Sequence, residues 1–372
     1  MQQSETMRVI LSGGGTGGHI FPAVAIAHAI RAKIPSCEIL FVGAKGRMEM
    51  EKVPAAGFKI IGLTISGLQR KLTLSNLSFP FKVLLSLLKA RKIIKSFGPD
   101  VVIGTGGYAS GPTLRAASWL GIPILIQEQN SFPGITNKIL SKKADVICVA
   151  YPGMDKFFPA DKIRITGNPV RKEIEFQKLD VQAAKKTFHL DPDNIVVLVV
   201  GGSLGARTLN QSLHQGLKQL IDHRIQVIWQ TGKSYAEKAS EAVRDLANTG
   251  IQTFPFISDM DQAYQAADIV VSRAGAIAIS ELCILAKPAI LVPSPNVTDD
   301  HQTKNALALA SRQAAIMISD HDVSEKLIDT IIALASDKEQ QKRLKINIRK
   351  MAHADAAFHI AELAIEIATK KK

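Results

Sequence analysis

The sequence predicts an α/β protein made of two doubly wound domains that face each other across a cleft. Short apolar runs rich in β-branched residues alternate with longer segments of helical period, which is the pattern of parallel α/β domains. Each half of the chain also opens with a strand, a glycine-rich turn and a helix, at residues 9–19 and again at 199–206. In such domains ligands bind at the carboxyl ends of the strands.

The expected strands follow in order along the chain. In the first half they are residues 8–11, 39–42, 101–103, 122–126 and 146–149, and in the second half residues 195–200, 226–229, 269–271 and 289–292. Glycine and a Pro-Val pair within 166–170 coincide with a change in charge character, which indicates a boundary. We therefore expect an N-terminal domain at 1–167 and a C-terminal domain at 168–354. The helix expected within 355–372 can dock back on the N-terminal domain or on the C-terminal one.

The composition is that of a folded protein in a reducing compartment. With 372 residues, of which 46% are hydrophobic and 21% charged, the chain can form two domains with substantial cores. Its three cysteines are far apart and form no CxxC pair, which argues against a disulfide framework or a zinc site. The polar start does not resemble a signal peptide, and no apolar run approaches the roughly 20 residues that span a bilayer. We expect a soluble or peripheral protein.

The net charge of +13 is concentrated in the N-terminal domain. Residues 1–167 contain 21 Lys and Arg against 9 Asp and Glu, whereas the rest of the chain contains 25 against 24. This asymmetry indicates an anionic partner for the N-terminal half. Nucleic acid is rejected because the sequence has no RNP, zinc-finger or helix-turn-helix pattern. An anionic membrane surface is the partner that we expect.

Residues 72–97 mix Leu, Phe and Ile with Lys and Arg, and no acidic residue occurs between Lys52 and Pro99. Some of the apolar residues must pack on the domain core, but the part up to Phe81 is more apolar than a solvated loop requires. Together with Trp119, if that residue lies nearby, the segment is predicted to contact a membrane interface. Each basic residue would add about 1 kcal/mol of attraction near anionic lipid.

The glycine-rich turns suit phosphate groups, because backbone N–H groups can approach an anion closely and the following helix N-terminus adds partial positive charge. Gly13-x-Gly15-x-x-Gly18 formally matches the dinucleotide fingerprint, which also requires an acid at the end of the second strand. Glu38 begins that strand, and residues 42–44 end it without an acid. An NAD(P)-dependent oxidoreductase is therefore disfavoured but remains an alternative.

A third glycine turn, at residues 104–111, exceeds what one phosphate site needs. Two substrates that each carry a diphosphate would use three such turns. The alternative is that some of the turns only permit close packing of a strand on a helix.

The segment 272–281 carries the most specific local signal. It follows the expected strand at 269–271, and the small residues after Gly275 can begin a helix whose N–H groups suit a diphosphate. Glu281 would then lie about a turn and a half into that helix. Its carboxylate could accept hydrogen bonds from both hydroxyls of a ribose. The alternative is an ordinary glutamate that faces solvent.

Several short motifs occur together and in a fixed order. They are GGTGGHIFP at 14–22, GGYASGP at 106–112, EQN at 128–130, GNPVR at 167–171, GGSLGA at 201–206 and RAGAIAISE at 273–281, followed by Gln302 and Asn305. In this combination the chain resembles, over nearly its whole length, the MurG family of undecaprenyl-diphospho-muramoylpentapeptide β-N-acetylglucosaminyltransferases.

The resemblance implies a GT-B fold of two Rossmann-like domains and a donor, UDP-N-acetylglucosamine (UDP-GlcNAc). The implied acceptor is the membrane-anchored undecaprenyl-diphospho-MurNAc-pentapeptide, called lipid I. Inverting transfer to the C4 hydroxyl of MurNAc would give lipid II for peptidoglycan synthesis, at the cytoplasmic face of the bacterial inner membrane. No cofactor and no obligatory metal are implied.

The same resemblance assigns site residues by position. Thr16, Gly17 and Gly18 belong to the glycine loop of the N-terminal domain, and Asn130 contacts the donor sugar. The donor pocket comprises Arg171, Ser203, Ile257, Ala276, Ile277, Ala278, Ile279, Ser280, Glu281 and Gln302. Backbone groups of Ile257 would meet uracil, and Glu281 would hold the ribose. Family members have a polar Thr where this chain has Ala278, so we expect backbone amides to suffice for the phosphate there.

Inverting transfer needs a base near the acceptor hydroxyl and groups that stabilise the departing diphosphate. His19 is the candidate base, because a helix N-terminus favours the neutral imidazole; alternatively it only donates a hydrogen bond to a phosphate or caps its loop. Glu128 is a second candidate base and could instead fix its loop. His301, after Asp299 and Asp300, is interpreted as part of a polar loop, because further metal ligands are lacking.

Two other classes of function remain open from the sequence. One is a UDP-GlcNAc 2-epimerase with the same two-domain fold, which would need no lipid acceptor. The other is a non-catalytic module that binds a UDP-sugar or a membrane surface.

Overall fold

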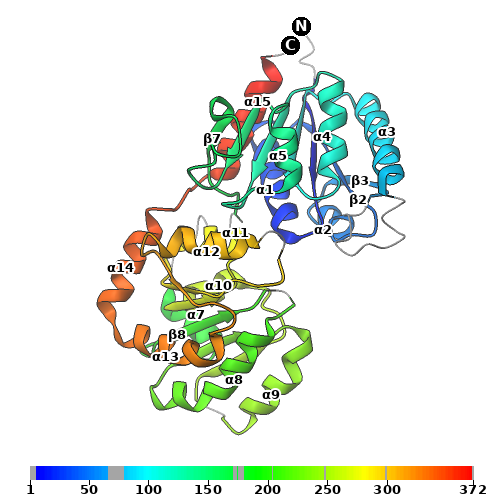
Figure 1. The fold of residues 1–372 in the computed structure, drawn as a ribbon. Coiled ribbons are helices and arrows are strands. Elements are labelled where there is room, and N and C mark those ends of the chain that lie inside the picture. The colour runs from blue at the N-terminus through cyan, green and yellow to red at the C-terminus, as the bar shows by residue number, and fades with distance from the viewer. Residues whose placement is uncertain are drawn as a thin grey trace. The chain divides into compact units, whose positions relative to one another are not determined.

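A computed structural model describes residues 6–65, 79–170, 174, 180–202, 204–246, 249–297 and 300–370. The chain forms two compact units: Met1–Arg171 with His353–Lys372, and Lys172–Ala352. The first unit ends a few residues beyond the boundary expected at 167, and the chain returns to it at His353. The C-terminal helix α15 (Ala356–Thr369) therefore belongs to the first unit, where it packs beside α1 (Gly17–Lys33) (Figure 1).

The described part of the first unit contains a seven-stranded parallel sheet in the order β3-β2-β1-β4-β5-β6-β7. Its strands are β1 (Arg8–Gly13), β2 (Glu38–Ala44), β3 (Lys59–Leu63), β4 (Val101–Gly106), β5 (Ile124–Glu128), β6 (Val146–Val149) and β7 (Ile163–Ile165). The central strands are buried along nearly their whole length and mostly apolar, because helices cover both faces of the sheet.

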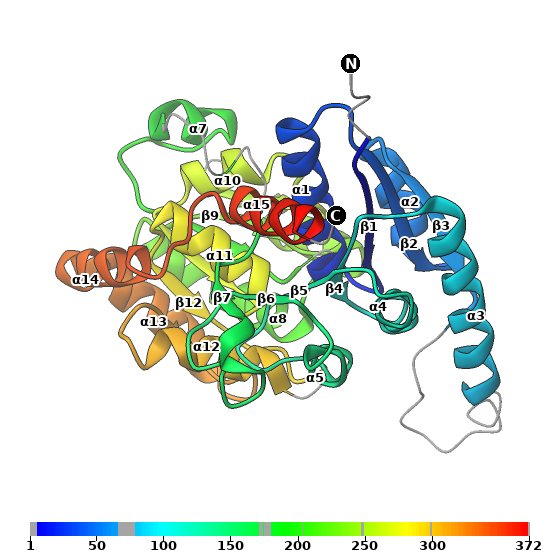
Figure 2. The ribbon, with the colours of Figure 1, turned by 90° about the horizontal axis from the view of Figure 1, so that it is seen from above.

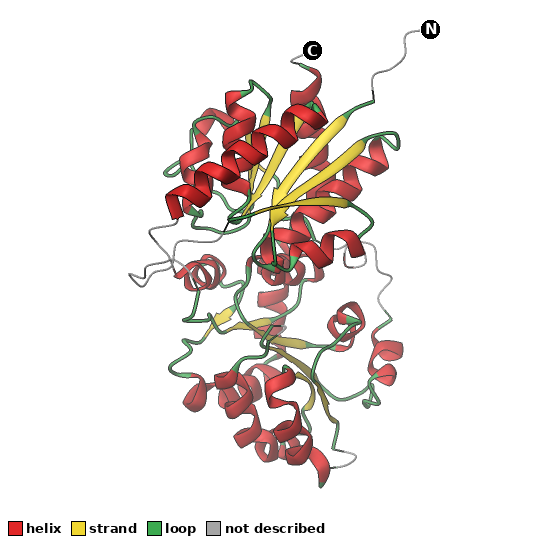
Figure 3. Ribbon diagram, turned by 90° about the vertical axis from the view of Figure 1, so that its right-hand side faces the viewer, coloured by secondary structure: helices red, strands yellow, loops and turns green. Residues whose placement is uncertain are grey.

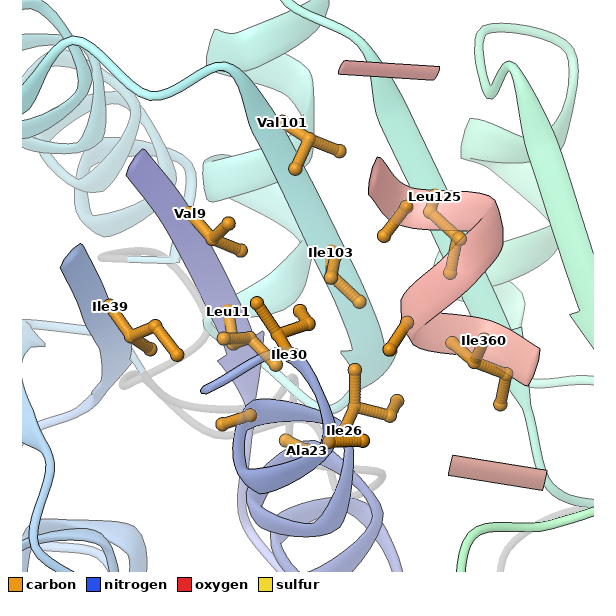
Figure 4. Close-up of a cluster of buried hydrophobic side chains, with 14 of the residues drawn as sticks. Val9, Leu11, Ala23, Ile26, Ile30, Ile39, Val101, Ile103, Leu125 and Ile360 are labelled. Carbon is orange, nitrogen blue, oxygen red and sulfur yellow. The ribbon is translucent and has the colours of Figure 1, made fainter. Parts of the chain in front are cut away.

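Alternating side chains of β1 divide the core of the first unit into two layers. Val9 and Leu11 pack toward α1 and α15, and Figure 4 shows Ile26 and Ile360 from these helices in the same cluster. Ile10 packs on the opposite side of the sheet. Helices α1, α2 (Glu49–Ala55) and α15 cover one face, and α3 (Phe79–Phe97), α4 (Ser110–Trp119) and α5 (Ile135–Ser141) cover the other (Figure 2). A short 3-10 turn, Ala160–Lys162, precedes β7.

The second unit repeats the plan with a six-stranded parallel sheet in the order β10-β9-β8-β11-β12-β13 among its described residues. Its strands are β8 (Val196–Val200), β9 (Gln226–Gln230), β10 (Ile251–Phe254), β11 (Ile269–Ser272), β12 (Ala289–Leu291) and β13 (Ile316–Met317). Its helices are α7 (Val181–Thr187), α8 (Arg207–Asp222), α9 (Ala236–Arg244), α10 (Met260–Ala266), α11 (Ala276–Leu285), α12 (His301–Ala310), α13 (Val323–Ser336) and α14 (Lys338–Arg349), with a 3-10 turn at Lys233–Tyr235. Figure 3 shows helices on both sides of the strands.

The order of the strands reverses next to β1 in the first sheet and next to β8 in the second. The pairs β1/β4 and β8/β11 are therefore topological switch points, where doubly wound domains bind ligands. The predicted fold class of two doubly wound α/β units is confirmed. Every strand expected from the sequence is present, although the one placed at 122–126 runs from Ile124 to Glu128. Four strands on the flanks of the sheets, β3, β7, β10 and β13, were not predicted. Among the described helices, none is both long and apolar enough to cross a bilayer.

Candidate functional site

Two glycine turns meet at the switch point of the first unit. The N–H of Gly14, after β1, donates to the carbonyl oxygen of Gly106, at the end of β4, over 3.3 Å. Gly107 has a φ of +88°, and a Cβ on it would lie 2.2 Å from the carbonyl oxygen of Gly14. Neither turn could approach the other so closely with a side chain at Gly107.

His19 lies in the first turn of α1, beside these turns. Its Nδ1 is 3.1 Å from the carbonyl oxygen of Gly14 and 3.3 Å from Oγ1 of Thr16. A carbonyl oxygen only accepts hydrogen bonds, so the contact with Gly14 requires a proton on Nδ1 and leaves the lone pair on Nε2. Gly106, with a φ of +101°, provides room for the ring, because a Cβ there would lie 2.9 Å from Cδ2 of His19.

The other predicted binding residues of this loop are exposed or half-buried. Thr16 is the residue before α1 and its hydroxyl does not cap the helix, while Gly18 is exposed and Gly17 is half-buried. The start of α1 also contains no acidic residue. Because α1 starts at the end of β1, its first N–H groups point to the carboxyl edge of the sheet. An anion site requires such groups and no acidic residue beside them.

Glu49 is a buried residue of this region that the sequence analysis did not identify. It is the first residue of α2, and its side chain is fully buried. Its carboxylate accepts hydrogen bonds from the N–H of Gly15 at 3.0 Å and from the N–H of Ala44, at the end of β2, at 2.9 Å. The dinucleotide fingerprint requires an acid near this strand end, and here the acid arrives from the next helix with both oxygens bonded to the protein. The signal that could have revealed it is the pair Gly14 and Gly43, which leave space for it.

Both carboxylate oxygens of Glu128, the second candidate base, accept hydrogen bonds from the following loop and from the start of α5. Oε1 accepts from the backbone N–H of Asn130 at 3.0 Å and from its Nδ2 at 3.2 Å. Oε2 accepts from the N–H of Gly134 at 3.2 Å and from Nδ2 of Asn137 at 2.8 Å. The side chain is 2% exposed. These contacts favour the alternative in which Glu128 fixes the loop between β5 and α5, and through it the predicted sugar contact Asn130.

In the second unit the glycine turn after β8 packs on the end of β9. A Cβ on Gly205, with a φ of +78°, would lie 2.2 Å from the carbonyl oxygen of Thr231. The buried side chain of Gln230 joins this turn to the predicted uracil contact. Its Nε2 donates to the carbonyl oxygen of Gly202 at 3.0 Å, and its Oε1 accepts from the N–H of Ile257 at 3.0 Å. The sequence analysis missed Gln230 because no local motif marks it.

Helix α11 begins directly after Gly275, at the end of β11. No described side chain caps its first turn, and that turn contains no acidic residue. The first N–H groups of a helix have no partner within the helix, so those of Ala276, Ile277 and Ala278 are directed back toward the end of β11. Ile279 is 1% exposed and packs in the core, and the hydroxyl of Ser280 donates to the carbonyl oxygen of Ala276 at 3.0 Å.

Glu281 is 5% exposed, which excludes the alternative of a solvent-facing glutamate. Its Oε2 accepts a hydrogen bond from the hydroxyl of Tyr264 at 3.1 Å. Gln302, in the first turn of α12, accepts from the N–H of Ser294 at 2.9 Å through Oε1. It therefore holds the loop that follows β12.

Arg273 braces the turn before α11. Its N–H donates to the carbonyl oxygen of Val200, at the end of β8, at 3.3 Å, which links the two turns of the switch point. Its guanidinium pairs with Asp320 at 2.5 Å and donates to Oγ1 of Thr208 at 3.0 Å. Asn305 donates to the carbonyl oxygen of Ala274 at 3.4 Å. The contacts fix the backbone from which α11 starts.

Two predicted donor contacts, Arg171 and Ser203, lie outside the described residues, and so does Asp299 in the polar loop before His301. Among the residues that the structure describes, no three His, Cys, Asp or Glu side chains are grouped to hold a metal ion. The three cysteines are buried free thiols. Burial raises the pKa of both Cys148 and Cys283 to about 12, which keeps these thiols protonated at neutral pH.

Models of glycosyltransferase family 28 match the chain over residues 9–149 for the N-terminal domain and 196–360 for the C-terminal domain. A protein of Cytophaga hutchinsonii is 54% identical over 99% of this chain and 98% of its own length. It is named UDP-N-acetylglucosamine–N-acetylmuramyl-(pentapeptide) pyrophosphoryl-undecaprenol N-acetylglucosamine transferase. The crystal structure of Acinetobacter baumannii MurG matches with a TM-score of 0.79 and 32% identity, over 97% of this chain and 99% of that one. The chain belongs to the MurG family of glycosyltransferases.

Membership of the MurG family confirms the resemblance inferred from the sequence motifs. A crystal structure of a UDP-N-acetylglucosamine 2-epimerase also matches, with a TM-score of 0.63 over 99% of this chain and 97% of that one. Its identity to this chain is 14%, so this likeness shows a common fold alone.

The glycine at position 106 provides a test of the geometry around His19. Gly106→Ala should lower the free energy of unfolding by about 1–3 kcal/mol, because the φ of +101° is strained for alanine and the new Cβ abuts the imidazole. Chemical denaturation followed by circular dichroism measures this change. Gly134→Ala is the matched control, because Gly134 has a φ of −64° and open space around it, and it should change stability by less than about 0.5 kcal/mol. Equal losses in both variants would contradict the geometry.

Proposed function

We propose that the chain transfers N-acetylglucosamine from UDP-GlcNAc to the C4 hydroxyl of MurNAc in lipid I, which gives lipid II for peptidoglycan synthesis. The observation that carries this proposal is the 54% identity, over 99% of the chain, to a relative whose name gives the same donor sugar and acceptor. Two local features support it. They are the uncapped start of α11 in the second unit and the imidazole of His19 at the glycine loop of the first.

The donor binds to the second unit. Its diphosphate lies against the N–H groups at the start of α11, which need no side chain at Ala278. The carboxylate of Glu281 accepts hydrogen bonds from the ribose hydroxyls, and the hydroxyl of Tyr264 sets the orientation of that carboxylate. Because the N–H of Ile257 is already donated to Gln230, its carbonyl oxygen is the group offered to the N–H of uracil. Arg171, Ser203 and Gln302 complete the proposed donor pocket.

The acceptor and the transferred sugar meet the first unit, where Thr16, Gly17, Gly18 and Asn130 are the proposed contacts. Nε2 of His19 takes the proton of the acceptor hydroxyl as the hydroxyl oxygen bonds to the anomeric carbon. The bond from that carbon to the β-phosphate oxygen breaks, and UDP leaves with the electron pair. The N–H groups of α11 stabilise the charge on the departing diphosphate. Attack opposite the leaving group inverts the anomeric configuration.

A labelled-sugar experiment tests this reaction against the alternatives. UDP-GlcNAc labelled in the sugar is supplied with and without a lipid I analogue, and label is followed into lipid, into an epimer or into neither. We expect label in the lipid fraction only when the analogue is present. An epimer formed without lipid would overturn the proposal and indicate a 2-epimerase. No turnover with or without the lipid I analogue would overturn it and indicate a binding module.

Substitutions of the two candidate bases distinguish their roles. His19→Ala should lower kcat by about 10² or more, because proton transfer to a positioned base typically contributes that much. Glu128→Gln should mainly lower the free energy of unfolding, by about 1–3 kcal/mol. The reason is that the four hydrogen-bond donors would then face a side chain with one acceptor oxygen. Steady-state kinetics and denaturation measure the two effects. A raised donor KM with unchanged kcat in His19→Ala would make His19 a binding residue.

We also propose that the first unit rests peripherally on the cytoplasmic face of the bacterial inner membrane. Four apolar side chains of α3, spaced to share one side of the helix, are each more than half exposed: Phe81, Leu84, Leu85 and Leu88, here called the α3 stripe. The same helix carries the basic residues Lys82, Arg91, Lys92 and Lys95. Trp119, on the neighbouring α4, is 57% exposed, and Arg115 lies over its ring. The part of the predicted contact at residues 72–78 lies outside the described residues.

Vesicle binding tests the α3 stripe. Leu85→Ser combined with Leu88→Ser should weaken binding to vesicles that contain phosphatidylglycerol by more than about 10-fold, because each buried leucine contributes roughly 1.5–3 kcal/mol. Co-sedimentation of the protein with the vesicles measures the change. Ile346→Ser is the control, since Ile346 is 49% exposed but lies on α14 of the second unit. Unchanged binding by the double variant would exclude the stripe as the membrane contact.

A further inference from the structure

The mechanism proposed above does not use the buried carboxylate of Glu49. Among the described residues no lysine, arginine or histidine forms an ion pair with it, and the side chain is 0% exposed. Burying a carboxylate without a cation is costly unless hydrogen bonds replace its hydration. Two backbone donors do so, the N–H groups of Ala44 and Gly15. A Cβ on Gly14 would lie 2.1 Å from Oε1, so the glycine loop is shaped around this carboxylate.

One peptide group connects Glu49 to His19. The N–H of Gly15, which donates to Oε2 of Glu49 at 3.0 Å, and the carbonyl of Gly14, which lies 3.1 Å from Nδ1 of His19, belong to the same peptide. In a planar trans peptide the N–H and the C=O point in opposite directions. The carboxylate therefore lies on one side of this peptide and the imidazole on the other, each bonded to it.

We propose that Glu49 is a positioning residue of the transfer reaction, which acts through the Gly14–Gly15 peptide to hold His19 in the tautomer and orientation of a general base. This inference rests on the proposed function, in which His19 takes the proton of the acceptor hydroxyl. Catalytic histidines commonly require a third group that orients the ring. Here that group is a carboxylate that reaches the ring through a backbone amide.

The hydrogen bonds that join Glu49, the Gly14–Gly15 peptide and His19 strengthen one another. A negative charge at the N–H of Gly15 polarises the peptide and makes the carbonyl oxygen of Gly14 a stronger acceptor. A stronger acceptor favours the proton on Nδ1 of His19 and so keeps the lone pair on Nε2. Thr16 provides the competing arrangement, because its hydroxyl, 3.3 Å from Nδ1, can donate to that nitrogen when the proton is on Nε2. Glu49 therefore favours the tautomer with the proton on Nδ1 over the one with the proton on Nε2.

Kinetics of Glu49→Gln tests this role. The substitution keeps the shape of the side chain but removes its charge, and one of the two backbone donors then faces an NH₂ group. We expect kcat to fall at least about 10-fold, with the KM values of both substrates changed by less than about 2-fold. In a His19→Ala background the same substitution should cause almost no further loss, because its effect passes through the imidazole. Additive losses, or a kcat equal to that of the unsubstituted enzyme, would overturn the proposal.

Glu51→Gln is the matched control for the change of charge. Glu51 lies on the same helix, its side chain is 79% exposed, and among the described residues it pairs only with the neighbouring Lys52. It should leave kcat within about 2-fold of the unsubstituted value. A loss in Glu51→Gln equal to that in Glu49→Gln would assign the effect to the charge of the unit as a whole and contradict a specific role for Glu49.

A measurement on the unsubstituted protein keeps the proposal testable if Glu49→Gln does not fold. Nitrogen NMR of protein labelled with ¹⁵N-histidine, with the His19 signals assigned by their loss in His19→Asn, reports which ring nitrogen carries the proton at pH 8. We expect the proton on Nδ1; a proton on Nε2 would overturn the proposal. This readout needs no substrate, so it tests the tautomer of His19 that the proposal requires separately from the transferase activity, whose absence would instead contradict the proposed function.

Discussion

The close approach of glycine backbones at the carboxyl ends of the strands is the constraint on which both candidate sites depend. In the first unit the carbonyl of Gly14 lies where a side chain on Gly107 would be, and in the second the carbonyl of Thr231 occupies the same place relative to Gly205. A side chain on Gly107 or on Gly205 would prevent these approaches. Because the turns within each unit are in contact, the helices that follow them start close to the strand ends. The first N–H groups of these helices therefore lie at the carboxyl edge of the sheet in their own unit.

Much of the fold could be predicted because the central strands carry their own signal. Runs such as 195–200 are apolar throughout, since both faces of a parallel sheet are covered. The missed strands are those on the flanks, where burial is partial: β7 contains the half-exposed Ile165, and β13 has only two residues. In the sites, the glycine turns and Glu281 were predictable from local sequence. Glu49 and Gln230 were not, because each acts by bridging segments that are distant in the chain and belongs to no motif.

The contacts also separate residues that resemble catalytic groups from residues that perform chemistry. Glu128 stands in a motif at the end of a central strand, as a catalytic carboxylate would, but four donors from the following loop and from α5 occupy its two oxygens. Arg273 likewise stands next to the turn proposed to bind the diphosphate, yet its guanidinium is committed to Asp320 and to backbone carbonyls. Residue type and spacing can locate such a site, but the division of labour within it depends on hydrogen bonds that only the folded chain reveals.

Helix α15 has a consequence for how the chain is made. Residues Lys172–Ala352 form a unit that is continuous in sequence, whereas the first unit is completed only by residues beyond His353. Ile360 and its neighbours fill the core against α1, the helix that carries His19. A ribosome synthesises those residues after the second unit, so the second unit can fold on emerging while the first still exposes an apolar face. The unit that begins first is completed only after the second unit has been made, and an enzyme without α15 would lose the packing behind the helix that carries its proposed base.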